Sequence, residues 1–156
     1  MKKLIGMLLI GAATLLQAGE YDLKTLGGKT IKMQNYDGNF VFEDPKYKKG
    51  NLVFFFFGTK CPYCEIDTPK VEKMVENGQI EVIGVEAQTK VDNSTLRRFV
   101  KKKGLQFAVL DRKSADRLIN YLDSRRILPG TVPTYMWVDK YGNLEALDFK
   151  DLANIR

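Results

Sequence analysis

Residues 52–64 read LVFFFFGTKCPYC, and this stretch decides the fold. Its first half, residues 52–57, is a continuous apolar run with the length of a strand, too short to cross a membrane. Such a run suits a central strand that is buried on both faces better than a strand with one exposed face. A short Gly-Thr-Lys segment then leads directly into Cys61, so the sequence predicts a buried strand followed by a tight turn into a helix.

The helix after this strand is predicted from Cys61 to about Asn77. Pro62 fits its first position, because the missing N–H of proline needs no partner there. Gly78 marks the stop. The apolar residues that recur at helical spacing and should face the core are Ile66, Val71, Met74 and Val75.

Further strands and helices alternate along the chain, and a hairpin ends it. The pattern predicts strands at 80–87, 106–110, 134–138 and 144–148, and helices at 93–103 and 114–125. Short alternating pieces near 30–33 and 39–42 predict small outer strands before the central one. This order predicts an α/β fold with a mixed central sheet flanked by helices.

The composition bounds the domain count and the chemistry. With 156 residues, of which 44% are hydrophobic, the chain can bury one core and is too short for two ordinary domains. The formal net charge of +6 is a mild excess that indicates ordinary solubility rather than nucleic-acid binding. Because the chain has no histidine, a Cys–His nucleophile pair is excluded.

Residues 1–18 are predicted to be a signal peptide. A positively charged start precedes the apolar stretch 4–16, and Ala18 supplies a small residue before the cut. The mature chain, residues 19–156, is expected as one domain in the periplasm or another extracytoplasmic compartment. Leu16 is bulky for its place before a cut, so an uncleaved membrane anchor is the alternative. Export would put cysteines where disulfides form.

The two cysteines of the chain are Cys61 and Cys64. At a helix N-terminus, Cys61 meets free amides and the positive end of the dipole, which favour the thiolate and predict an exposed nucleophile. Cys64 lies one turn deeper on the same face and is the natural resolving thiol. One alternative is a zinc site, but two cysteines without a histidine do not supply enough ligands for it. The others are a structural disulfide, which would close only a very short loop, and copper delivery. No metal or other cofactor is expected.

Asp67 follows Cys64 by about one helical turn. On the buried side of the helix it could accept the proton that Cys64 must lose before it attacks. The alternative is a surface carboxylate favoured by the helix dipole, which is also the expectation for Glu65.

These motifs resemble the thioredoxin superfamily. The matching segments are the apolar strand before Cys61-Pro62-Tyr63-Cys64 and Thr-Val-Pro-Thr, residues 131–134, before a second apolar strand. Within the superfamily, residues 20–148 are similar to exported TlpA/ResA-like thioredoxins, including those that serve cytochrome c maturation. Shared features are the export signal, the acid and proline at Asp67 and Pro69, and an extra helical segment near 93–104.

The resemblance implies a thioredoxin fold with extra amino-terminal strands and an inserted helical segment. It implies that Cys61 attacks, that Cys64 resolves, and that a cis peptide bond precedes Pro133. The backbone of Val132 would then pair with an extended substrate peptide, which Pro62 and Tyr63 would also contact. The chain departs from the family in having Lys60 where Trp often stands, and in a carboxyl end that is short for the family's closing helix.

The expected function is a periplasmic thiol-disulfide oxidoreductase that reduces client proteins such as apocytochrome c by mixed-disulfide exchange. Expected partners are clients with cysteine pairs and a membrane thiol-disulfide relay protein as electron donor; the chain should be a monomer that binds no nucleic acid. One alternative is an oxidase or isomerase of the Dsb type, which Pro-Tyr between the cysteines favours. The others are a glutaredoxin-like protein, whose cofactor is glutathione, and a non-enzymatic envelope module that binds peptides.

Overall fold

The computed structural model describes residues 19–155, so the predicted signal peptide, residues 1–18, lies outside the described residues. Within them a five-stranded central sheet has the order β10-β9-β6-β7-β8. Its strands are β6 (Leu52–Phe57), β7 (Glu81–Glu86), β8 (Ala108–Val109), β9 (Thr134–Val138) and β10 (Leu144–Leu147). β7 and β8 run parallel to β6, whereas β9 is antiparallel to β6, and β10 is antiparallel to β9. The predicted mixed sheet is confirmed.

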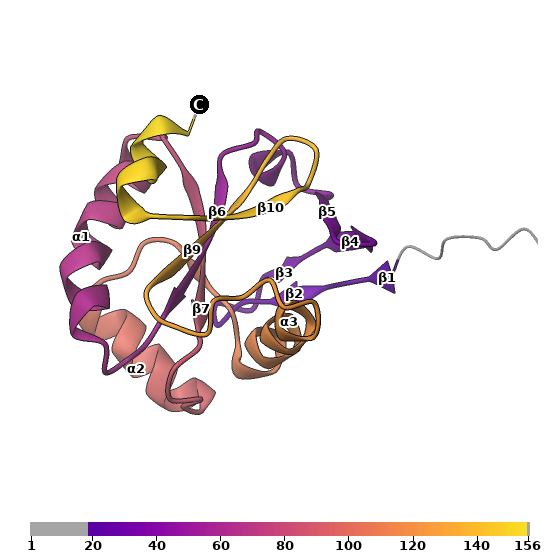
Figure 1. Ribbon diagram of the computed structural model, residues 1–156. Helices are drawn as coiled ribbons and strands as arrows, with labels where there is room; N and C mark the ends of the chain where they lie inside the picture. Colours follow the sequence, from indigo (N-terminus) through magenta and orange to yellow (C-terminus); the bar gives the residue numbers. More distant parts are fainter. Residues whose placement is uncertain (1–18, 156) are drawn as a thin grey trace, which may run out of the picture.

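Helices and small strands cover the two faces of this sheet (Figure 1). One face carries α1 (Pro62–Glu76), α2 (Asn93–Lys103) and the 3-10 segment η2 (Phe149–Asn154). The other face carries α3 (Arg112–Ser124) and the amino-terminal elements. These are β1 (Gly19–Glu20), β2 (Leu23–Lys24), β3 (Thr30–Ile31), β4 (Met33–Tyr36), β5 (Asn39–Phe42) and the 3-10 turn η1 (Pro45–Tyr47). None of the helices within residues 19–155 is long and apolar enough to cross a membrane.

β6 is buried on both faces, since each of its residues is at most 2% exposed. Its side chains alternate between two clusters, as the period of a strand requires. Phe54 and Phe56 pack with residues of α3 and the amino-terminal strands. Phe55 and Phe57 pack with residues of α1, α2 and η2. The apolar run therefore forms the fully buried central strand that the sequence predicts.

Three local expectations need correction. The strand predicted at 106–110 shortens to β8, because the Gln106 N–H donates to a Glu72 carboxylate oxygen at 2.9 Å instead of to a strand. α3 begins earlier than predicted, at Arg112, because the Asp111 side chain caps it. Ile66 is 58% exposed rather than buried, since it lies on the outer side of α1. The short carboxyl end still closes the sheet, because η2 buries Leu152 completely.

A buried ion pair joins the end of β7 to α3. Glu86 is fully buried, and its Oε2 accepts a hydrogen bond from Arg112 Nη1 at 2.8 Å. Its Oε1 accepts from the backbone N–H groups of Gln88 and Thr89 at 3.1 and 2.8 Å. The carboxylate thus has a counter-charge and holds the loop after β7 in place.

We expect Arg112→Leu to lower the free energy of unfolding by about 3–5 kcal/mol, because it leaves the buried Glu86 carboxylate without its counter-charge. Urea unfolding followed by circular dichroism measures the change. The matched control is Lys29→Leu, which removes a surface ion pair with Asp44 (3.0 Å) and should move the unfolding midpoint little. Equal losses in the two variants would contradict the importance of the buried pair.

Candidate active site

The turn at the end of β6 places Cys61 at the N-cap of α1, with Pro62 in the first turn. Cys61 Sγ accepts a hydrogen bond from the Cys64 backbone N–H at 3.1 Å. The two cysteines form a disulfide with their Cα atoms 5.2 Å apart. A sulfur atom at this position faces the free amides of the helix, which would stabilise a thiolate once the disulfide is reduced.

Both cysteines are buried in this disulfide form, with Cys61 4% and Cys64 3% exposed. The expectation of an exposed Cys61 is therefore wrong for the oxidised protein. The reason is that both sulfur-bearing side chains belong to the same apolar cluster, against which Val132 also packs. The exposed surface beside the disulfide comes instead from Tyr63 and Ile66, at 72% and 58% exposure. The surface there is thus largely apolar.

The segment before β9 reaches the same cluster from a distant part of the chain. The Val132–Pro133 peptide bond is cis. Thr134 Oγ1 donates to the Thr131 carbonyl at 2.7 Å, which ties this turn together. The structure therefore brings Val132 and the cysteine pair into one apolar cluster.

Asp67 faces β9 and is bound by two partners. Tyr135 Oη donates to Asp67 Oδ2 at 2.7 Å, and Lys70 Nζ lies 3.6 Å from Asp67 Oδ1. Burial raises the pKa of Tyr135, and the Asp67 carboxylate raises it further, so the hydroxyl stays a donor at neutral pH. No hydrogen bond among residues 19–155 joins Asp67 to either cysteine. Asp67 is thus not a free surface acid, because both of its oxygens have partners among the described residues.

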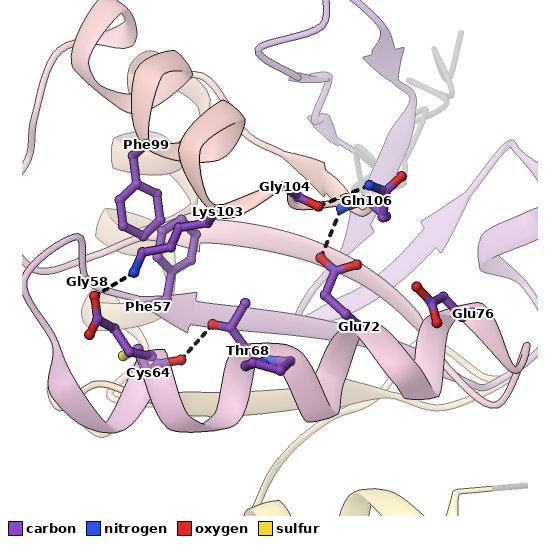
Figure 2. A pocket seen from close by; sticks show the side chains of 12 residues that line it. Phe57, Gly58, Cys64, Thr68, Glu72, Glu76, Phe99, Lys103, Gly104 and Gln106 are labelled. Carbon is purple, nitrogen blue, oxygen red and sulfur yellow. Dashed lines mark hydrogen bonds and ion pairs between the residues drawn. The ribbon is translucent and has the colours of Figure 1, made fainter.

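A groove of about 410 Å³ runs between α1 and α2, and Figure 2 shows the side chains along it. Cys64 lines one end together with Phe99 of α2, and Glu72 and Glu76 line the other. An ion pair of 2.7 Å between Glu65 and Lys103 joins the two helices at the Cys64 end. The predicted inserted helix therefore forms one wall of a groove that reaches Cys64.

Three residues near the site carry no motif in the sequence: Tyr135, Glu72 and Glu86. Each takes its role from a partner far along the chain, as when Tyr135 binds Asp67. For Glu86 a signal existed, because a charged residue at the end of an apolar strand run departs from the pattern. Within residues 19–155 no group of three or more Cys, Asp or Glu side chains is arranged to hold a metal ion.

Comparison with known proteins assigns the family. Residues 16–147 match the AhpC/TSA family. The chain belongs to this family. This AhpC/TSA-family protein is also similar to the thiol-disulfide oxidoreductase ResA of Halalkalibacterium halodurans, with 30% identity over 132 residues. The match covers 82% of this chain and 64% of ResA, so the chain spans less than two thirds of that relative. The predicted resemblance is confirmed.

Solved structures agree on the fold of this family member. A putative thioredoxin from Neisseria meningitidis superposes with a TM-score of 0.61 at 24% identity, covering 88% of this chain and 85% of that one. StoA from Bacillus subtilis superposes with a TM-score of 0.60 at 16% identity, covering 89% and 97%. The predicted thioredoxin fold with extra amino-terminal strands is confirmed.

Proposed function

We propose that this protein is a thiol-disulfide oxidoreductase that acts through Cys61 and Cys64. The observation that carries the proposal is the disulfide at the N-terminus of α1, in which Cys61 Sγ already accepts the Cys64 N–H. Similarity to ResA supports it. Cofactor-free exchange between sulfur atoms needs no histidine, which the chain lacks.

The exchange proceeds in two steps. The Cys61 thiolate attacks one sulfur of a client disulfide, which forms a Cys61–client disulfide and releases the other client sulfur as a thiolate. The Cys64 thiolate then attacks the Cys61 sulfur and releases the second client thiolate. The protein ends as the Cys61–Cys64 disulfide, and the client has gained two electrons. The proposed client-binding residues around the cysteine pair are Val132, Pro133, Pro62 and Tyr63.

We expect Cys61→Ser to abolish insulin-disulfide reduction and Cys64→Ser to accumulate mixed disulfides, because only the second variant keeps the attacking thiol. Non-reducing gels and mass spectrometry of the trapped species measure the outcome. Equal trapping by both variants would contradict the roles. Insulin turnover by Cys64→Ser equal to that of the wild type would favour a peptide-binding module instead.

The proposed direction of transfer is reduction of clients such as apocytochrome c, with a membrane thiol-disulfide relay protein as electron donor. The resemblance of the sequence to exported TlpA/ResA-like thioredoxins supports this direction, whereas Pro-Tyr between the cysteines favours the Dsb-type alternative. Equilibration with glutathione measures the reduction potential of the Cys61–Cys64 pair. We expect a value near that of thioredoxin, about −270 mV; a value near about −120 mV would assign the protein to the oxidases.

Export of the protein is proposed from its amino-terminal sequence, with residues 1–18 as the signal and residues 19–156 as a monomeric mature domain. The positive start, the apolar stretch and Ala18 support this. Protein recovered from the extracytoplasmic fraction should begin near Gly19. Full-length protein confined to the cytosol would contradict export and favour the glutaredoxin alternative.

Asp67 is the proposed proton acceptor for Cys64, and Tyr135 is the residue that orients it. We expect Asp67→Asn to slow release from the mixed disulfide more than the initial attack by Cys61. Losses for a missing general base are about 10²–10⁴-fold. Single-turnover kinetics between about pH 6 and 9, where thiols titrate, separate the two steps.

The matched control for this test is Glu65→Gln. It removes a carboxylate from the same helix, but from the groove side, where Glu65 pairs with Lys103 at 2.7 Å. It should leave the release step close to the wild-type rate. A release step that is unchanged by Asp67→Asn over the whole pH range would assign Asp67 a purely structural role.

A further inference from the structure

The turn Gly58-Thr59-Lys60, which joins β6 to Cys61, has little support of its own. Its internal hydrogen bond, from the Cys61 N–H to the Gly58 carbonyl, is 3.4 Å long. This is longer than the usual value of about 2.9–3.0 Å, so the bond is weak. The turn alone therefore does not fix the position of Cys61, and contacts from outside must do so.

The loop after β7, residues 87–90, contacts every residue of this turn. The Gln88 side chain lies so close to Gly58 that a Cβ atom on Gly58 would be 2.6 Å from the Gln88 Cβ. Gln88 Oε1 accepts the Lys60 N–H at 3.3 Å. The hydroxyl oxygens of Thr59 and Thr89 are 2.9 Å apart. The bond between the two hydroxyl groups is thus the shortest hydrogen bond between loop and turn.

The two threonines extend a chain of hydrogen bonds that begins at a buried charge. Glu86 is fully buried, and its Oε2 accepts a hydrogen bond from Arg112 Nη1 at 2.8 Å. Its Oε1 accepts one from the Thr89 hydroxyl at 3.0 Å. Because an ionised carboxylate only accepts, Thr89 gives its proton to this bond and offers a lone pair to Thr59, which is the donor. The chain therefore runs from Arg112 through Glu86 and Thr89 to Thr59, two residues before Cys61.

The position of Cys61 decides how stable its thiolate is. In the oxidised protein, Cys61 Sγ accepts the Cys64 N–H at 3.1 Å at the N-terminus of α1. After reduction, the same amides stabilise the thiolate only while the sulfur stays in place, because a hydrogen bond weakens steeply with poor geometry. A stable thiolate favours the reduced form and so raises the reduction potential of the pair. Whatever holds the turn therefore acts on the redox chemistry.

We propose that Glu86 is a positioning residue for Cys61, and that it acts through the hydroxyl groups of Thr89 and Thr59. The inference rests on the proposed function and adds to it a buried charge that raises the reduction potential of the cysteine pair. Breaking the chain should loosen the turn and destabilise the Cys61 thiolate by about the size of one hydrogen bond. That size is about fivefold in an equilibrium constant, or about 20 mV in the reduction potential.

The test replaces threonine with valine, which has nearly the same shape and no hydroxyl group. Thr59→Val and Thr89→Val each break the chain, whereas Thr59→Ser keeps its donor. The reduced proteins are alkylated with iodoacetamide between about pH 5 and 10, where thiols titrate, and mass spectrometry follows the Cys61 peptide. We expect the apparent acid dissociation constant of Cys61 to fall about fivefold in both valine variants, and Thr59→Ser to match the wild type.

These substitutions change no charge, so an altered pH profile reports the position of Cys61. The turn before β9, residues 129–133, carries no charged side chain. The charged residues of the other elements that meet at the disulfide all stay in place: Lys60 of the turn, Glu65, Asp67 and Lys70 of α1, Lys90 of the loop, and Lys103 of α2.

Two comparisons separate positioning from a general loss of stability. If the threonines act through each other, the double variant should behave like Thr89→Val alone, because the chain is already broken. The matched control is Thr25→Val, which removes a buried hydroxyl that accepts the Lys29 N–H at 3.1 Å. We expect it to lower the urea midpoint and to leave the Cys61 profile unchanged. Should Thr59→Val fail to fold, Thr59→Ala removes the same hydroxyl without adding bulk.

The outcomes distinguish this inference from the proposed function. An unchanged Cys61 profile in the folded valine variants overturns the inference and leaves the oxidoreductase proposal standing. Additive effects of the two substitutions, or an equal change in Thr25→Val, overturn it as well. Alkylation needs no client, so it decides the inference even if the cysteine pair does not exchange with glutathione. That last result would count against the oxidoreductase proposal instead.

Discussion

The pairing of β6 with a parallel strand on one side and an antiparallel strand on the other is the constraint on which the rest of the structure depends. Phe57 pairs with Glu86 of β7, and Phe56 pairs with Thr134 of β9. The end of β6 and the beginning of β9 therefore meet at one edge of the sheet. Because every β6 side chain is buried, a shift of one residue would move each of them to the wrong face. This register brings Cys61 and the Val132–Pro133 turn to the same edge.

The loop after β7 then fixes the turn that carries Cys61. Buried Glu86 holds this loop, and two of the loop's residues reach the Gly-Thr-Lys turn before Cys61. Gln88 Oε1 accepts the Lys60 N–H at 3.3 Å, and the hydroxyl groups of Thr89 and Thr59 are 2.9 Å apart. The start of α1 is thus held in two ways: by its own capping, and by the loop after β7, which the Glu86–Arg112 ion pair keeps in place. Geometry at the disulfide depends on packing beyond the helix itself.

Structural features that depend only on residues close together in the sequence could be predicted. The apolar run of β6 and the N-cap position of Cys61 follow from local pattern, and the thioredoxin resemblance implied the cis bond before Pro133. Contacts between distant segments could not be predicted in this way. Tyr135 looks like any strand aromatic until β9 pairs with β6 and its ring stacks on Phe55, 5.1 Å away. Cys61 likewise lies in a cluster against which Val132 packs, although no local pattern connects the two residues.

Cys64 lies between two acidic faces of α1 that differ in how their carboxylates are satisfied. On the β9 side, Asp67 has one oxygen on Tyr135 and the other near Lys70, so its position is fixed. The Tyr135 hydroxyl thereby ties α1 to β9 through a hydrogen bond of 2.7 Å. On the α2 side, Glu72 keeps one oxygen unpartnered among the described residues. The segment after α2, whose Gln106 N–H binds the other oxygen of Glu72, covers this carboxylate, so Glu72 forms part of the wall of a groove beside the disulfide.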